Sequence, residues 1–199
     1  MTGGYGRNGT EIGVALSSVR AYFEAEGWVD LSSLPVPRWH HCQVTVDNAV
    51  YVIGGKEGVD WNDPPQSSVF ILSEGQEWVK GSSLPTPLSQ HSCAVMGSKI
   101  YVVGGYNDDK VEGSSVYILD TSTTGSSWES GPALPEPRAN AQAVVSEDTL
   151  YLFGGMYKTD VFTLTAGDQA WSVVSGSNIT DHRVIFPAPF ITSDVMHCK

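Results

Sequence analysis

A five-residue pattern that returns every 50 residues is the strongest constraint on how this chain can fold. It combines an aromatic residue, two large apolar residues and two glycines, and reads YVIGG at 51–55, YVVGG at 101–105 and YLFGG at 151–155. Tryptophans and LPxP sequences recur with it, at Trp28, Trp78 and Trp128 and at 34–37, 84–87 and 134–137. Because a catalytic motif is usually needed once, recurrence at a fixed period indicates a repeated structural unit.

One period contains the signals for four short antiparallel strands. Residues 39–46 (WHHCQVTV) and 49–53 (AVYVI) are strand-like, and the residues between them, 47–48 (DN), are a tight-turn signal. SSVFIL at 67–72 and EWVKG around Trp78 supply the third and fourth strands. One such sheet cannot bury both of its faces alone, and stacking several around an axis does so. The sequence therefore predicts an all-β propeller.

The repeated unit also resembles a known family. The run LPVPRWHHCQVTVDNAVYVIGG, followed by SSVFIL and EW, is similar to a kelch repeat in its double glycine, the aromatic before it, the spaced tryptophan and the PR that leads into the first strand. One copy departs from the pattern, because Leu88 stands where Arg38 and Arg138 stand in the others. The resemblance covers nearly the whole chain and implies a kelch-type β-propeller with three full and two partial repeats of four-stranded antiparallel blades.

The repeats divide the chain, taken as a single domain over residues 1–199, into five parts. These are a partial blade at 1–33, blades at 34–83, 84–133 and 134–176, and a partial first strand of a further blade at 177–199. Kelch propellers usually have more blades, so we expect an incomplete or open propeller. The alternative is a closed four-bladed ring, in which the two ends of the chain complete one blade. The three tryptophans spaced 50 residues apart are expected to be mostly buried between blades.

Composition disfavours several classes of partner. The formal net charge is −11, with 22 acidic against 11 basic residues, so binding to nucleic acid or to anionic membranes is not expected. No apolar run is long enough to span a membrane, and the first residues, MTGGYGRNGT, show no signal-peptide pattern. Cys42, Cys93 and Cys198 have no spacing typical of a disulfide framework or a zinc site. We therefore expect reduced thiols and a cytoplasmic protein.

The resemblance implies that the first strand of each blade lines the axis, and that the loops before it share a face with the loops after the double glycine. The post-glycine loops vary in length, with 14, 11 and 6 residues from the second glycine to the valine of the third strand, as expected of loops that specialise. The candidate partner-binding residues are those of both loop sets: Arg38, Trp39, His40, Lys56, Glu57, Ser89, Gln90, Tyr106, Asn107, Arg138, Asn140 and Tyr157.

Arginines beside amides and aromatic rings suit the recognition of an acidic peptide. The alternative is that Arg38 and Arg138 pack their stems along neighbouring blades. His41 and His91 share a repeat position that holds Ala141 in the third copy. Without a third ligand fixed nearby, we interpret them as buried structural histidines and expect neither a metal nor a cofactor.

The preferred function is a protein–protein interaction module. The resemblance implies a substrate-recruiting propeller, as in cullin ubiquitin ligase adaptors, or a scaffold such as the actin-associated kelch proteins. The alternative is a fragment of a carbohydrate-active kelch enzyme, such as a sugar oxidase or a sialic-acid epimerase. A copper-radical oxidase would need two tyrosines, histidines and a tyrosine-linked cysteine around the axis, and the sequence shows no such set. Enzyme activity is therefore not expected.

Overall fold

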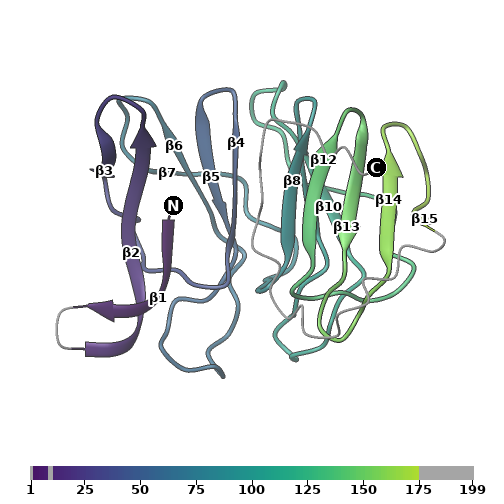
Figure 1. Ribbon diagram of the computed structural model, residues 1–199, viewed down its shortest axis with the longest axis horizontal. Helices are drawn as coiled ribbons and strands as arrows, with labels where there is room; N and C mark the ends of the chain where they lie inside the picture. Colours follow the sequence, from purple (N-terminus) through teal and green to yellow (C-terminus); the bar gives the residue numbers. More distant parts are fainter. Residues whose placement is uncertain (1, 9–10, 175–199) are drawn as a thin grey trace.

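The computed structural model describes residues 2–8 and 11–174, which form four antiparallel sheets side by side (Figure 1). Three sheets are four-stranded, and we call them blades 1, 2 and 3. Blade 1 is β4 (Cys42–Val46), β5 (Ala49–Ile53), β6 (Val69–Ser73) and β7 (Val79–Lys80). Blade 2 is β8 (Ser92–Met96), β9 (Lys99–Val103), β10 (Val116–Asp120) and β11 (Glu129–Ser130). Blade 3 is β12 (Gln142–Ser146), β13 (Thr149–Phe153), β14 (Val161–Thr165) and β15 (Ser172–Val173).

The first sheet has three strands, β1 (Thr2–Asn8), β2 (Glu11–Phe23) and β3 (Gly27–Leu31), and we call it the N-terminal sheet. The predicted partial blade is thus present, and β1 and β2 extend beyond it as a hairpin that projects past the sheet (Figure 1). The N-terminal sheet and blade 3 lie at opposite ends of the row, so the described residues form an open propeller. The strand predicted within 177–199 lies outside them. No described helix is long and apolar enough to cross a membrane.

Apolar side chains fill each junction between neighbouring sheets. Val19 and Leu34 meet Phe70 between the N-terminal sheet and blade 1. The other two junctions are built from equivalent positions, represented by Ile53 with Ile100 and by Val103 with Leu150. The large apolar residues of the repeated pattern therefore belong to the contact layer between the stacked sheets. Burial of sheet faces against neighbouring sheets is what makes the single sheets stable.

The double glycines let the next blade approach the strand end. In three of the four pairs the second glycine donates its backbone N–H to the loop of the following blade, with distances of 2.6, 2.8 and 2.7 Å for Gly4 to Arg38, Gly55 to Leu88 and Gly105 to Arg138. A Cβ on the first glycine would meet the same carbonyl oxygen, at 2.2 Å for Gly104 and Arg138. The glycines are needed because a side chain would occupy the place of the neighbouring backbone.

Two-residue turns join the first and second strands of each blade, as predicted. Asp47 and Asn48 both have positive φ, at 49° and 59°, which matches the twist of a hairpin. Gly97 and Glu147 take the same conformation in blades 2 and 3, at 61° and 53°. We call this end of the molecule the turn face.

Tryptophans tie each blade to the one before it. Near the outer strand, each indole N–H donates to a carbonyl of the preceding sheet over 2.8 Å: Trp78 to Ser32, Trp128 to Ser82 and Trp171 to Pro132. Trp171 lies outside the 50-residue period because the last post-glycine loop is short, so the sequence pattern did not reveal it.

The burial predicted for Trp28 is wrong. Its side chain is 52% exposed and contacts the ring of Tyr22 edge-on, with centroids 5.6 Å apart. The reason is its position, because no sheet precedes β1–β3 in the described part of the chain and the indole therefore has no blade to pack against.

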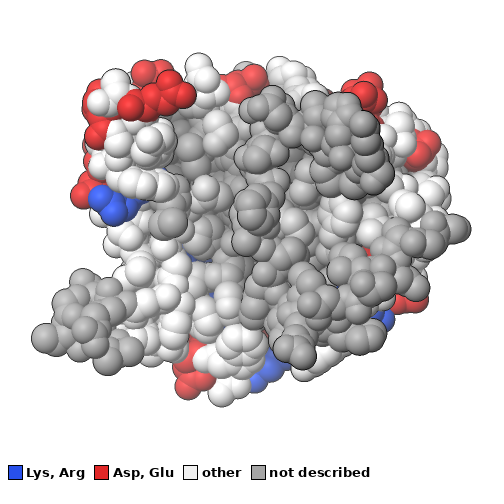
Figure 2. All heavy atoms as spheres, in the orientation of Figure 1, with Lys and Arg blue, Asp and Glu red and all other residues white. Residues whose placement is uncertain are grey.

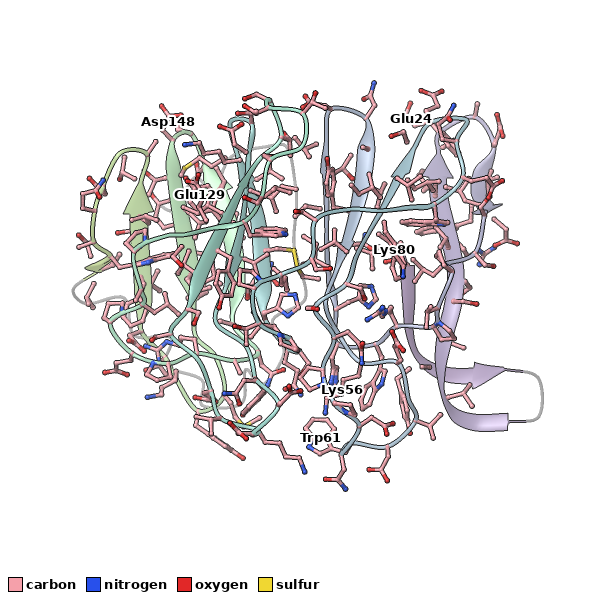
Figure 3. The ribbon with its side chains drawn as sticks, turned by 180° about the vertical axis from the view of Figure 1, so that it is seen from behind. Glu24, Lys56, Trp61, Lys80, Glu129 and Asp148 are labelled. Carbon is pink, nitrogen blue, oxygen red and sulfur yellow. A yellow bond between two sulfur atoms is a disulfide. The ribbon has the colours of Figure 1, made fainter. Side chains whose placement is uncertain are left out.

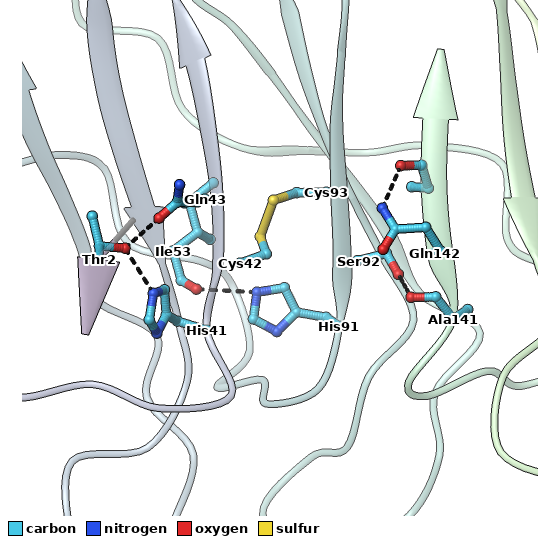
Figure 4. The surroundings of a disulfide bond; sticks show 11 residues. Thr2, His41, Cys42, Gln43, Ile53, His91, Ser92, Cys93, Ala141 and Gln142 are labelled. Carbon is cyan, nitrogen blue, oxygen red and sulfur yellow. Dashed lines mark hydrogen bonds between the residues drawn. A yellow bond between two sulfur atoms is a disulfide. The ribbon is translucent and has the colours of Figure 1, made fainter. Parts of the chain in front are cut away.

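A disulfide between Cys42 and Cys93 joins β4 to β8, with the two Cα atoms 5.9 Å apart (Figure 4). The expectation of reduced thiols is therefore wrong for these two residues. In the repeat, Cys93 corresponds to Gln43 rather than to Cys42, and the two sulfurs meet despite this offset of one residue. Because disulfides persist mainly in oxidising compartments, the bond also removes the thiol argument for a cytoplasmic location.

We expect Trp128→Ala to lower the free energy of unfolding by about 3–5 kcal/mol, because it empties a junction between two blades. Trp28→Ala is the matched control and should cost less than about 1 kcal/mol, as for other exposed side chains. Urea unfolding measures both, and a similar loss in the two variants would contradict the packing described here.

A second pair of variants isolates the contact at the double glycine. Gly97 and Gly104 have nearly the same φ, 61° and 64°, but a Cβ on Gly97 would meet nothing within 4 Å. Gly97→Ala should cost about 1–2 kcal/mol from backbone strain alone. Gly104→Ala should cost about 2 kcal/mol more, because it overpacks the contact with Arg138. Equal losses in thermal or urea unfolding would show that the contact does not constrain the residue.

Candidate binding face

The two loop sets meet at the end of the molecule opposite the turn face. The pre-strand loops are 38–41, 88–91 and 138–141, the post-glycine loops are 56–66, 106–115 and 156–160, and together they form what we call the loop face. Figure 3 shows Lys56 and Trp61 at this end and Glu24 and Asp148 at the other.

Backbone hydrogen bonds hold the two loop sets together. Trp39 and Lys56 exchange N–H···O bonds of 3.1 and 2.8 Å, and Ser89 and Tyr106 exchange bonds of 3.0 and 2.8 Å. Blade 3 repeats the contact through the N–H of Met156, which donates to its own pre-strand loop over 3.0 Å. The candidate residues therefore sit on a fixed base rather than on free loops.

Three of the candidates form a ladder that crosses the blades. The Gln90 N–H donates to the His40 carbonyl and the Asn140 N–H donates to the Gln90 carbonyl, both over 2.9 Å. Their side chains bond in the same order, at 2.6 Å from Asn140 Nδ2 to Gln90 Oε1 and 3.2 Å between Gln90 Nε2 and His40 Nδ1. All three residues have φ near 55°, and Gln90 and Asn140 are buried. The ladder fixes the relative position of the three pre-strand loops.

His40 takes part in the ladder as a neutral ring. Desolvation, together with the charge of Lys56, lowers the pKa of His40 to about 4. The Gln90 amide can then donate to an unprotonated Nδ1. The imidazole accordingly carries no charge near neutral pH.

The side chain of Arg38 makes its polar and ring contacts within its own blade. Its side chain is 1% exposed and donates to the Gly54 carbonyl over 3.2 Å and to Ser68 Oγ over 2.5 Å. Its guanidinium pairs with Glu57 at 2.8 Å and lies over the Phe70 ring, 5.2 Å from the centroid. Two of the candidate residues, Arg38 and Glu57, thus form an ion pair with each other.

Arg138 repeats this arrangement in blade 3. It is also 1% exposed, bonds to Asp160, lies 3.6 Å from Glu136 and stacks over Phe162 at 4.4 Å. Both arginines are therefore buried, as in the packing alternative, but their side-chain contacts lie within their own blades rather than along neighbouring ones, and neither guanidinium is open to a partner. Sequence reasoning missed the aromatic residue beneath each of them.

An aromatic cluster with two half-exposed rings lies on the loop face. Trp39 is buried at its centre, with ring centroids 4.8 Å from Tyr5, 4.2 Å from His40 and 5.9 Å from Trp61. Lys56 is buried beside it, donates to the Trp61 carbonyl over 2.5 Å and lies over both indole rings. Desolvation, and secondarily Lys110, lowers the pKa of Lys56.

Tyr5 and Trp61 form the outer part of this cluster, 52% and 50% exposed. Neither was among the predicted site residues. Trp61 could have been found because it lies in the longest post-glycine loop. Tyr5 could not, because it comes from the irregular N-terminal sheet.

A pocket of about 280 Å³ opens beside the cluster, between the post-glycine loops of blades 1 and 2. Its lining combines aromatic, amide, hydroxyl and charged side chains: Lys56, Trp61, Asn62, Asp63, Pro65, Ser89, Gln90, Tyr106, Asn107, Asp108, Lys110 and Met156. Tyr106 donates to Glu112 over 3.1 Å, and desolvation together with this bond raises the pKa of the phenol to about 12. Ser89 is fully buried, and its hydroxyl has no hydrogen-bond partner among the described residues.

The structure thus sorts the candidate residues into groups. Trp39 and His40 belong to the aromatic cluster, and five candidates line the pocket: Lys56, Ser89, Gln90, Tyr106 and Asn107. Asn140 serves the ladder, and Tyr157 stands apart with 82% exposure.

The two axial histidines each lie within hydrogen-bond distance of a group in the preceding sheet. His91 Nε2 lies 3.1 Å from the Ile53 carbonyl, and burial lowers the pKa of His91 to about 4. His41 Nε2 lies 2.9 Å from Thr2 Oγ1 in the N-terminal sheet. Both residues line an open cavity of about 680 Å³ along the first strands. Within residues 2–8 and 11–174, no three His, Cys, Asp or Glu side chains gather as a metal site would require.

Comparisons with known proteins agree with this architecture. A solved structure described as "Structure of YjhT" superposes with a TM-score of 0.71 at 20% sequence identity, covering 90% of this chain and 66% of that one. This chain thus spans just under two thirds of that protein, and the likeness shows the fold. A search of curated protein sequences finds no match. The sequence model of the KLHDC2/KLHL20/DRC7 Kelch-repeats domain matches residues 40–183, and the chain therefore belongs to the Kelch-repeat domain family.

Proposed function

We propose that the chain is a protein-interaction module that binds an extended segment of a partner protein on its loop face. The observation that carries the proposal is the pocket between the loops of blades 1 and 2, next to the half-exposed rings of Tyr5 and Trp61. Rigid aromatic side chains beside a pocket are the features that anchor protein interfaces. The ladder beneath them keeps the surface in place before a partner binds.

The role that we propose is recruitment or scaffolding rather than catalysis. Two of the titratable groups that line the pocket, Lys56 and Tyr106, are engaged by the carbonyl of Trp61 and the carboxylate of Glu112. The match to a Kelch-repeats domain supports a protein-interaction role. Substrate recruitment, which the resemblance to ubiquitin ligase adaptors implied, and an actin-associated scaffold are the two forms of that role that we propose.

An acidic peptide was the partner suggested by the arginines. Arg38 and Arg138 are buried and already paired with carboxylates of their own blades. The two arginines therefore no longer support an acidic partner, and the proposal rests on the aromatic cluster and the pocket instead.

The test is partner capture with two matched double variants of the full chain. Tyr5→Ala with Trp61→Ala removes the two half-exposed rings of the aromatic cluster. Tyr22→Ala with Trp28→Ala removes equally exposed rings from the N-terminal sheet, 61% and 52% accessible. Partners recovered from cell lysate and quantified by mass spectrometry should lose at least about tenfold in the first variant, as for an anchor worth about 2 kcal/mol, and remain in the second. Loss only in the second variant would place the interface elsewhere.

A further inference from the structure

The loops that border the pocket carry an excess of negative charge. Residues 56–66 and 106–112 hold six acidic side chains and two lysines. Both lysines are engaged: Lys56 is buried against the Trp61 carbonyl, and Lys110 donates to Asn62 Oδ1 over 2.5 Å. On the side of the molecule that Figure 2 shows, acidic side chains likewise outnumber basic ones.

Four of the six carboxylates have neither an ion-pair partner nor a side-chain hydrogen-bond donor in the described part of the chain, although Asp63 and Asp60 accept backbone N–H bonds within their own loop. Glu57 pairs with Arg38, and Glu112 accepts the hydrogen bond from Tyr106. The remaining four are Asp60, Asp63, Asp108 and Asp109, and all but the half-buried Asp63 are exposed. Among them, Asp63 and Asp108 line the pocket itself.

These carboxylates lie beside exposed apolar surface. Trp61 lines the same pocket as Asp63 and Asp108, and half of its side chain is accessible. Val59 and Val111 extend the apolar surface along the two loops, 56% and 57% exposed. An indole face flanked by carboxylates suits a lysine or arginine, whose stem packs on the ring while its charge is neutralised.

A separate observation points to a ligand in the same place. The Ser89 hydroxyl is buried at the pocket, and no described group satisfies its hydrogen-bonding capacity. Buried polar groups are almost always paired, so an unpaired hydroxyl in a pocket lining is a position at which a ligand group can complete the bonding. The Ser89 hydroxyl is an observation independent of the carboxylates in the loops that border the pocket, which we call the acidic rim.

We infer that the segment bound on the loop face is basic, with a lysine or arginine placed in the pocket between Asp63 and Asp108 and against Trp61, next to a large apolar residue on the outer aromatic surface. The inference rests on the proposed function, because it names the chemistry of the same partner. Lys110 is the competing cation at the rim. Its removal should therefore strengthen binding, whereas a site for acidic peptides would be weakened by the same change.

The experiment selects peptides from a random dodecapeptide phage library on the full-length protein, and then measures synthetic copies of the enriched peptides by isothermal titration calorimetry. We expect the enriched set to carry net positive charge together with an aromatic or large aliphatic residue. Affinity should fall with added salt, because exposed charges are screened.

Matched variants separate local from overall charge. Asp60→Asn with Asp108→Asn and Asp109→Asn removes three charges from the rim and should weaken binding about tenfold. Glu24→Gln with Glu74→Gln and Asp148→Asn removes three charges from the opposite end and should leave affinity within about twofold, because that end lies beyond the screening length. Lys110→Gln should tighten binding by a fewfold.

The outcomes distinguish the inference from the function on which it rests. Enriched peptides that require Trp61 but are acidic or uncharged would overturn the basic-segment inference and leave the loop face as the binding surface. Peptides that bind Trp61→Ala as tightly as the wild type would overturn both. Weaker binding by Lys110→Gln, or equal losses in the two triple variants, would also overturn the inference.

Discussion

The contact between a double glycine and the loop of the following blade is the constraint on which the rest of the structure depends. It occurs at all three junctions described, through hydrogen bonds donated by Gly4, Gly55 and Gly105. At each junction, backbone of the next blade occupies the space that a side chain on the first glycine of the pair would take. Because this contact sets the position of the next pre-strand loop, it also sets the start of the next innermost strand. The ladder through Gln90 and the pairing of Ser89 with Tyr106 follow from that placement. The loop face is thus a consequence of blade stacking.

The repeat period predicts whatever is the same in every blade. Strand order, the two-residue turns and the apolar contact layer all depend on local sequence and on equivalent neighbours, so they could be inferred from 50 residues of pattern. Trp28 shows where this reasoning stops. Its sequence context matches that of Trp128, but its burial depends on a neighbouring sheet, and the number of sheets is not encoded in the repeat.

The candidate site was only partly predictable for a related reason. Sequence position placed Arg38 and Arg138 near the right surface, but whether an arginine points outward or inward depends on what lies beneath it. Phe70 and Phe162 supply a ring beneath the two guanidinium groups. In the copy where leucine replaces arginine, the ring position is Tyr117, whose hydroxyl lies 2.9 Å from Thr86 Oγ1. A sequence signal for the buried arginines therefore existed: the position before the first strand and the aromatic position of the third strand change together between repeats, with arginine beside phenylalanine and leucine beside tyrosine.

The disulfide makes one junction mechanically unlike the other two. The Cys42–Cys93 bond joins the innermost strands of blades 1 and 2, and 51 positions separate the two residues along the chain. If the ends of the chain were pulled apart, the hydrogen-bonded junctions could open by shear, but the segment between the two cysteines could not lengthen. The extended molecule would be shorter than its full contour by about 170 Å, at roughly 3.4 Å per residue. The strands of blade 1 therefore lie inside the closed loop and are shielded from tension, whereas the N-terminal sheet, blade 3 and β9–β11 of blade 2 lie outside it and can be extended.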